Sequence, residues 1–176
     1  MSWTRHHKRG EILRDVVVAV DERRDGLLPM DLPGVAETFA GELDLLAALH
    51  LRWHTRLSGR IETELATQPM NLEDAVVDAW HGAADDLPGI RAVLDRYHAL
   101  PVDETMAASL ARAQAKEHQV LAVMSGKGSF ADPQCVALGS MIELRARAEY
   151  VPAPEIVERR RFGGLVDRFR SALAVA

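Results

Sequence analysis

The sequence predicts an all-α fold, a single-domain helical bundle of about 5–7 helices around a long central helix at about residues 34–67. Apolar residues recur at steps of three and four through most of the chain. Ala, Leu, Arg and Glu, which favour helices, fill most of the remaining positions. Clusters of Pro and Gly separate these periodic blocks, so each cluster is expected to end a helix.

The N-terminal region is expected to be a basic arm at residues 1–10, followed by a helix at 11–24 with Val16 and Val20 on its apolar side. The block 34–67 would be about 50 Å long as one unbroken helix. Gly59 lies inside this block and predicts a kink or a close helix crossing.

Further helices are predicted over 71–86, after Pro88, over 103–125 and over 133–149. Asn71 and Asp103 are suited to cap the starts of two of these helices, and Asp132 followed by Pro133 is a similar start signal. In the helix at 133–149 the residues that recur at helical spacing are Leu138, Met141, Ile142 and Arg145. Residues 126–129 are interpreted as a helix end and linker, although their glycines superficially resemble a phosphate-binding loop.

Residues 11–150 are therefore expected to form the bundle, and residues 151–176 a C-terminal amphipathic basic helix. Arg159, Arg160, Arg161, Arg168 and Arg170 form the polar side of that helix. It is predicted to pack on the bundle or on a partner subunit.

Composition excludes several classes of protein. The chain has 176 residues, 48% of them hydrophobic, which suits one domain and excludes a disordered protein. No apolar run approaches the roughly 20 residues of a membrane span. The lone Cys135 excludes an internal disulfide framework, and we expect a cytoplasmic protein.

Charge is unevenly distributed along the chain, whose net charge is -5. Residues 25–110 contain five Lys or Arg against fifteen Asp or Glu, whereas both ends are basic. An acidic body repels phosphates, so no nucleic-acid surface is expected there. The basic ends are suited to dock on acidic surfaces of the same chain or of a partner.

Two polar residues interrupt the predicted apolar stripes. His50 stands where the central helix would carry a leucine, and His54 lies one turn further on. Glu117 lies in the apolar stripe of the helix at 103–125. An unpaired buried carboxylate is costly, so Glu117 is expected to have a partner or to lie in a hydrated cavity. The candidate partners are His50, Arg52, Arg56 and Arg145.

Asp78 and His81 form a second candidate constellation, because side chains three apart on a helix point in the same direction and can share a metal ion. Asp95 and His98 repeat this spacing. The ordinary alternative for such residues is a solvated helix face. For His50 and Glu117 the ordinary alternative is a structural buried hydrogen bond.

The favoured hypothesis is a non-catalytic helical protein that acts by protein–protein contacts as a homo-oligomer. The sequence contains no complete catalytic constellation, so an enzyme is not favoured. The alternative is a helical bundle that binds a divalent transition metal or haem, and that could be an enzyme. The candidate ligands are His50, His54, Glu117, Asp78 and His81. The favoured hypothesis needs no cofactor. A ligand cavity lined by Trp53, Trp80, Met106 and Met124 is a third interpretation, although such residues ordinarily form core.

Overall fold

The computed structural model describes residues 2–152, with the side chains of residues 7–152. Within this range the chain forms seven α-helices and no strand, which confirms the prediction of an all-α, single-domain bundle. The helices are α1 (Ser2–Arg23), α2 (Val35–Thr38), α3 (Glu42–Ala66), α4 (Leu72–Asp86), α5 (Pro88–Ala99), α6 (Glu104–Met124) and α7 (Cys135–Glu149).

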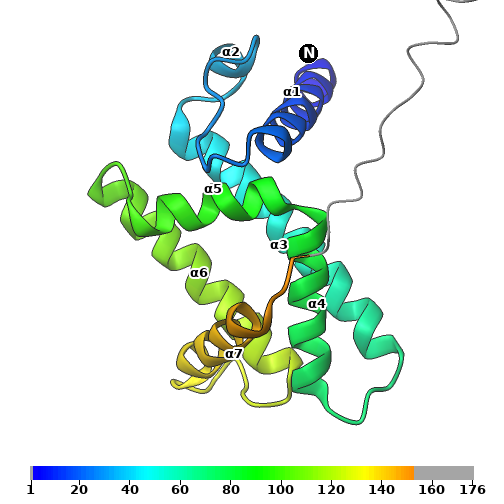
Figure 1. The fold of residues 1–176 in the computed structure, drawn as a ribbon. Helices are drawn as coiled ribbons and strands as arrows, with labels where there is room; N and C mark the ends of the chain where they lie inside the picture. The colour runs from blue at the N-terminus through cyan, green and yellow to red at the C-terminus, as the bar shows by residue number, and fades with distance from the viewer. Residues whose placement is uncertain (1, 153–176) are drawn as a thin grey trace, which may run out of the picture.

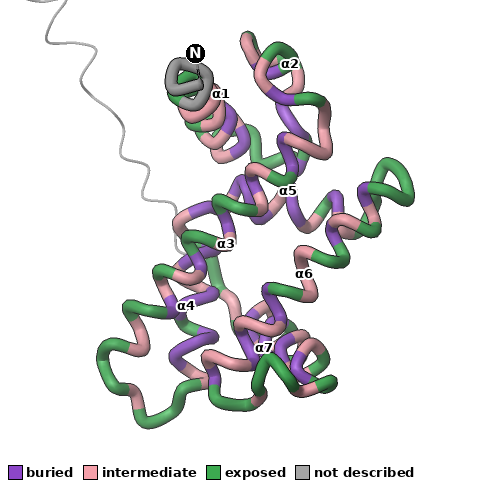
Figure 2. The backbone as a smooth tube through the Cα atoms, turned by 180° about the vertical axis from the view of Figure 1, so that it is seen from behind, coloured by how far each residue is buried: buried purple, intermediate pink, exposed green. Residues whose placement is uncertain are grey.

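The helices are arranged around α3, which runs through the middle of the molecule (Figure 1). α4 returns alongside α3, and α5 crosses α3 and packs against α1. α7 packs mainly on α6 and also contacts α4. Buried and exposed stretches alternate along the long helices (Figure 2), as expected when one face of each helix packs on the others.

The predicted central helix at 34–67 is wrong in its first part, because α2 and α3 are separate helices. Phe39 ends α2 with extended backbone angles and a buried side chain. Gly41 then has φ of 151°, a backbone conformation that disfavours any side chain. α3 itself has 25 residues, about 37 Å at 1.5 Å per residue.

The basic N-terminal segment is part of a continuous helix from residue 2 onward, because α1 has no break at residue 10. Arg9 connects α1 to α3 through two bonds to the Asp44 carboxylate, of 2.8 and 3.1 Å. Its guanidinium also lies over the Phe39 ring, 4.3 Å from the centroid. The predicted C-terminal helix with its arginines lies outside the described residues.

The predicted N-caps of α4 and α6 are confirmed. The Asn71 side chain accepts from the backbone of Glu73 and Asp74, and the Asp103 side chain accepts from Met106. α7 begins two residues later than expected, with Gln134 as its N-cap residue.

The end of α6 confirms the interpretation of residues 126–129 as a helix end. Gly126 has φ of 73°, and the amides of Gly126 and Lys127 donate to the carbonyls of Val123 and Ala122. This is the bond pattern of a Schellman helix terminus, which requires a residue such as glycine at the left-handed position.

Two other glycines, and not Gly59, allow helices to cross closely. A side chain on Gly139 of α7 would collide with the backbone of His118 in α6. A side chain on Gly89 of α5 would collide with the backbone of Val20 in α1. A side chain on Gly59 would meet nothing within 4 Å, so the predicted close crossing there is wrong.

The core consists mainly of the inward faces of α3, α4 and α5. Trp53, Trp80 and Met106 belong to it and Met124 packs against it, as in the ordinary interpretation of these residues as core. The largest fully buried side chains are Trp53, Leu45, Leu46, Leu49, Leu57, Ile61, Ile90, Leu94, Leu121, Val16, Val20 and Val35. No helix within residues 2–152 combines the length and apolar character needed to cross a bilayer.

Candidate functional site

A buried carboxylate lies where α3 and α6 meet, as the sequence predicts for Glu117, which is 3% exposed. Its hydrogen-bond donor is Trp53 of α3, whose indole Nε1 lies 3.0 Å from each carboxylate oxygen. His50 lies one turn earlier on α3, with its Nε2 3.8 Å from Glu117 Oε2. His50 is therefore a close neighbour, whereas Trp53 supplies the hydrogen bonds.

Burial sets the ionisation of this pair. Desolvation raises the pKa of the Glu117 carboxyl, and it outweighs the positive charge of Arg91 and the Trp53 bond, which act in the opposite direction. Desolvation also lowers the pKa of the His50 imidazole to about 4, assisted by His98 and Arg91. His50 is consequently uncharged at neutral pH, and its buried Nδ1 has no hydrogen-bond partner within the described part of the chain.

A second buried polar group joins α5, α6 and α7. His118 Nε2 lies 2.6 Å from Glu143 Oε2, and Arg147 donates to Glu143 Oε1 over 2.7 and 2.9 Å. Arg147 also donates to Asp95 of α5, which accepts a further bond of 2.8 Å from Arg91.

The charges of this second group are balanced locally. Burial alone would raise the pKa of Glu143, but the hydrogen bond from His118 and the charge of Arg147 lower it to about 2. Arg91 lies over the Trp53 ring at 4.7 Å, which links this group to the Glu117 site.

Sequence periodicity identifies Glu117 but not Arg91, His118 or Glu143 as buried polar residues. A charged residue beside an apolar stripe is normally solvent-facing, and burial here depends on three helices meeting at one point. The available signal is the spacing of Glu143 and Arg147, four residues apart, which favours an ion pair on one helix face.

The five candidate metal ligands are divided between separate environments. His50 and Glu117 come together, and His54 lines the same surface groove as His50. Asp78 is exposed on α4, whereas His81 donates from Nε2 to the Ala146 carbonyl of α7 at 2.7 Å. Asp78 and His81 therefore point in different directions. Within the described residues no three His, Cys, Asp or Glu side chains gather in a way that would hold a metal ion.

The metal- or haem-binding alternative stays a prediction. It would need ligands in addition to His50 and Glu117. Elemental analysis of the untagged protein and of its His50→Ala and Glu117→Gln variants would test it, since stoichiometric metal lost in both variants would support it.

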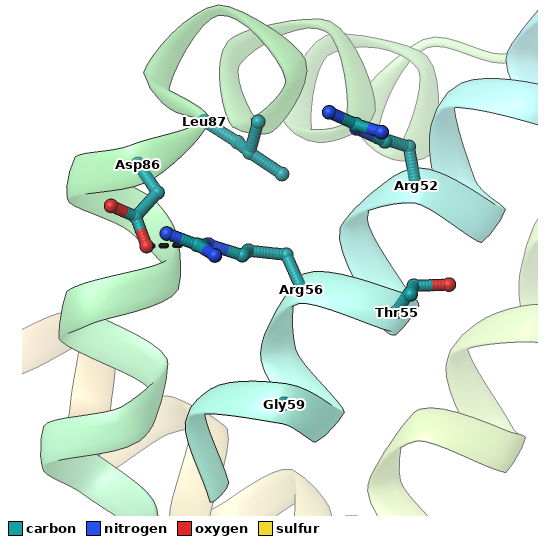
Figure 3. Close-up of a pocket in the computed structure, with 6 residues that line it drawn as sticks. All are labelled: Arg52, Thr55, Arg56, Gly59, Asp86 and Leu87. Carbon is teal, nitrogen blue, oxygen red and sulfur yellow. Dashed lines mark hydrogen bonds and ion pairs between the residues drawn. The ribbon is translucent and has the colours of Figure 1, made fainter. Parts of the chain in front are cut away.

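Several surface hollows flank α3 in the described part of the chain, and two of them contain groups named above or lie near such groups. One, of about 350 Å³, lies between α3 and α6 beside His50. The other, of about 430 Å³, lies between α3 and the junction of α4 and α5. Figure 3 shows Arg52 and Arg56 projecting into this second hollow, where Arg56 Nε donates to Asp86 at 2.6 Å. Arg60 donates to the same carboxylate oxygen at 2.7 Å.

These groups do not assemble an activated nucleophile. The hydroxyls of Thr55, Thr63 and Ser125 donate to backbone carbonyls of their own helices. The Cys135 thiol is buried and directed at the Gln119 carbonyl. The buried His and carboxylate groups contact one another or Trp and Arg side chains. These contacts stabilise the packing between helices.

Comparison of the chain with protein-family models, with curated proteins and with solved structures finds no match.

Proposed function

We propose that this is a non-catalytic helical protein that acts by protein–protein contacts, and that it forms a homodimer by helix packing. The observation that carries the proposal is that α7 is apolar on two opposite faces. Its inward side carries the apolar residues Cys135, Gly139, Ile142 and Ala146, which are buried against the bundle together with Glu143. The lone buried thiol of Cys135 is also consistent with a cytoplasmic location.

The outward face of α7 is formed by Ala137, Met141, Leu144 and Ala148, spaced by four, three and four residues. Met141 is 68% exposed and Leu144 is 65% exposed. Met141 belongs to the apolar stripe predicted for this helix, but it faces outward. An uncovered apolar stripe on a helix at this spacing is typical of a surface that packs on another helix.

A second copy of the chain is the partner that we propose for this face. The four residues of the stripe carry no charge, so two copies of α7 can pack face to face without repulsion between like charges. The neighbouring Arg145 is already paired with Glu73, Asp74 and Glu149, which neutralises the edge of the stripe.

Size-exclusion chromatography with light scattering on the full chain tests this proposal. We expect the wild type to be a dimer, and the double variant Met141→Glu, Leu144→Glu to be a monomer with unchanged helical circular dichroism. Leu100→Glu is the matched control, because Leu100 is 69% exposed but lies between α5 and α6. This control variant should remain dimeric.

A wild-type protein that is strictly monomeric over a wide concentration range would rule out the homodimer. Dimers that persist in the double variant would rule out the α7 face as the contact.

A further inference from the structure

The groove between α3 and α6 is lined by apolar, basic and uncharged polar side chains, and no acidic residue is among them. Its volume of about 350 Å³ lies within the range of small-molecule sites. The lining residues are Ala47, His50, Leu51, His54, Ser109, Arg112, Ala113 and Lys116.

The groove contains two cations of α6, and none of the described carboxylates forms an ion pair with either of them. Arg112 donates to the Ser109 hydroxyl at 3.1 Å, and neither Arg112 nor Lys116 has an ion-pair partner among the described side chains. The hollow on the other side of α3 differs, because it contains a carboxylate, Asp86, which pairs with Arg56 and Arg60. In a chain of net charge -5, the α3–α6 groove therefore has a local excess of positive charge.

The rest of the groove is suited to an apolar group. Leu51 is 65% exposed at its edge, with the small residues Ala47 and Ala113 beside it. The uncharged His50 also lines the groove, and its buried Nδ1 has no partner within the described chain. A ligand that covered Leu51 would remove apolar surface from water, and a polar group near His50 could complete its hydrogen bonding.

We infer that the α3–α6 groove binds an amphipathic organic anion, whose acidic head group contacts Arg112 and Lys116 and whose apolar part lies over Leu51, Ala47 and Ala113. The charge-assisted bonds to the head group supply specificity for an anion. The apolar contacts supply specificity for a ligand with a hydrocarbon part. This site is separate from the α7 face, so its failure would leave the proposed homodimer untouched.

Isothermal titration calorimetry of the full chain with dodecanoate, below its critical micelle concentration, tests the inference. We expect one site per chain. Acetate, which lacks the apolar part, should not bind measurably, and dodecyltrimethylammonium, which has the opposite charge, should bind more weakly by about tenfold or more.

The variants locate the site. The double variant Arg112→Gln, Lys116→Gln should weaken dodecanoate binding by about tenfold or more. Ala113→Phe, which fills the exposed groove without altering the core, should also abolish it. Arg52→Gln is the matched control, because Arg52 is an exposed arginine of α3 that faces the other hollow. It should bind dodecanoate as the wild type does.

Absence of saturable dodecanoate binding would overturn the inference. So would equal binding of the ammonium ligand, or unchanged affinity in the Arg112→Gln, Lys116→Gln variant. Loss of binding in Met141→Glu, Leu144→Glu would also overturn it, because dodecanoate would then be bound at the α7 face.

Discussion

Glu117 shows at the scale of one residue how a carboxylate is accommodated inside an apolar bundle. The Trp53 indole donates to both of its oxygens, and a neutral imidazole, that of His50, lies beside it. Burial still raises the pKa of Glu117, so the charged form remains costly. The Trp53 bond offsets part of that cost, and its removal would leave a buried carboxylate without a donor.

We therefore expect Trp53→Phe to lower the free energy of unfolding by about 3 kcal/mol, and Glu117→Gln to change it by less than about 1 kcal/mol. The Gln side chain keeps an oxygen that accepts from Trp53 but carries no charge to bury. Urea denaturation at pH 7 measures both values.

A double-variant cycle is the control for this prediction. Trp53→Phe should cost less in the Glu117→Gln background than in the wild type, because the neutral amide depends less on the indole donor. Equal costs in the two backgrounds would contradict a stabilising bond from Trp53 to the carboxylate.

His50 predicts a second effect at this scale. Its folded pKa of about 4 is below the ordinary value of 6.5, so the unfolded chain binds the proton more readily than the folded chain. Stability should therefore fall as the pH is lowered from about 6.5 to about 4.

In His50→Gln this acid-dependent loss should be smaller by up to about 3 kcal/mol. Thermal or urea unfolding across the same pH range measures it. Parallel pH profiles for the wild type and the variant would show that His50 is not buried as the structure describes.

At the scale of the element, glycine positions decide which helices can approach. Gly139 and Gly59 are both in helices, but Gly139 faces the backbone of α6 whereas Gly59 faces open space. Their helical propensities are the same, so the difference between them is a difference in packing alone.

Gly139→Ala is expected to destabilise the protein by about 3 kcal/mol, because the new methyl group would force α7 away from α6. Gly59→Ala should stabilise it by about 0.5–1 kcal/mol, through helix propensity. Thermal unfolding of the two variants gives the comparison. A stabilising effect at both positions would mean that α6 and α7 do not cross closely at Gly139.

At the scale of the whole molecule, the connected side chains of His118, Glu143, Arg147 and Asp95 join the three consecutive helices α5, α6 and α7. Glu143 is its centre, and its folded pKa of about 2 is below the ordinary value of 4.5. It contributes stability that is present above about pH 4.5 and is lost as the pH falls toward about 2.

Glu143→Gln should therefore lower the free energy of unfolding at pH 7 by about 2–3 kcal/mol and should flatten its decline between about pH 4.5 and 2. Glu149→Gln is the control, because Glu149 is an exposed partner of Arg145 on the same helix, where an ion pair contributes little. If both variants lose the same stability, the buried connection has no special role.

The sequence by itself determined the helical class and most helix boundaries. The step of three or four between apolar residues, and caps such as Asn71 and Asp103, are local properties that one segment contains in full. The buried position of Glu117 followed from the same periodicity. The break at Gly41 was missed, because its effect depends on Phe39 turning into the core.

Tertiary structure alone decided which polar groups meet. Trp53 as the donor to Glu117, and the burial of Arg91, His118 and Glu143, arise where separate helices cross. Tertiary packing also decided the orientation of α7. A helix with two similar apolar faces has no sequence signal that selects which face is buried. Periodicity describes the surface of a single helix, whereas a site depends on the neighbour that each surface finds.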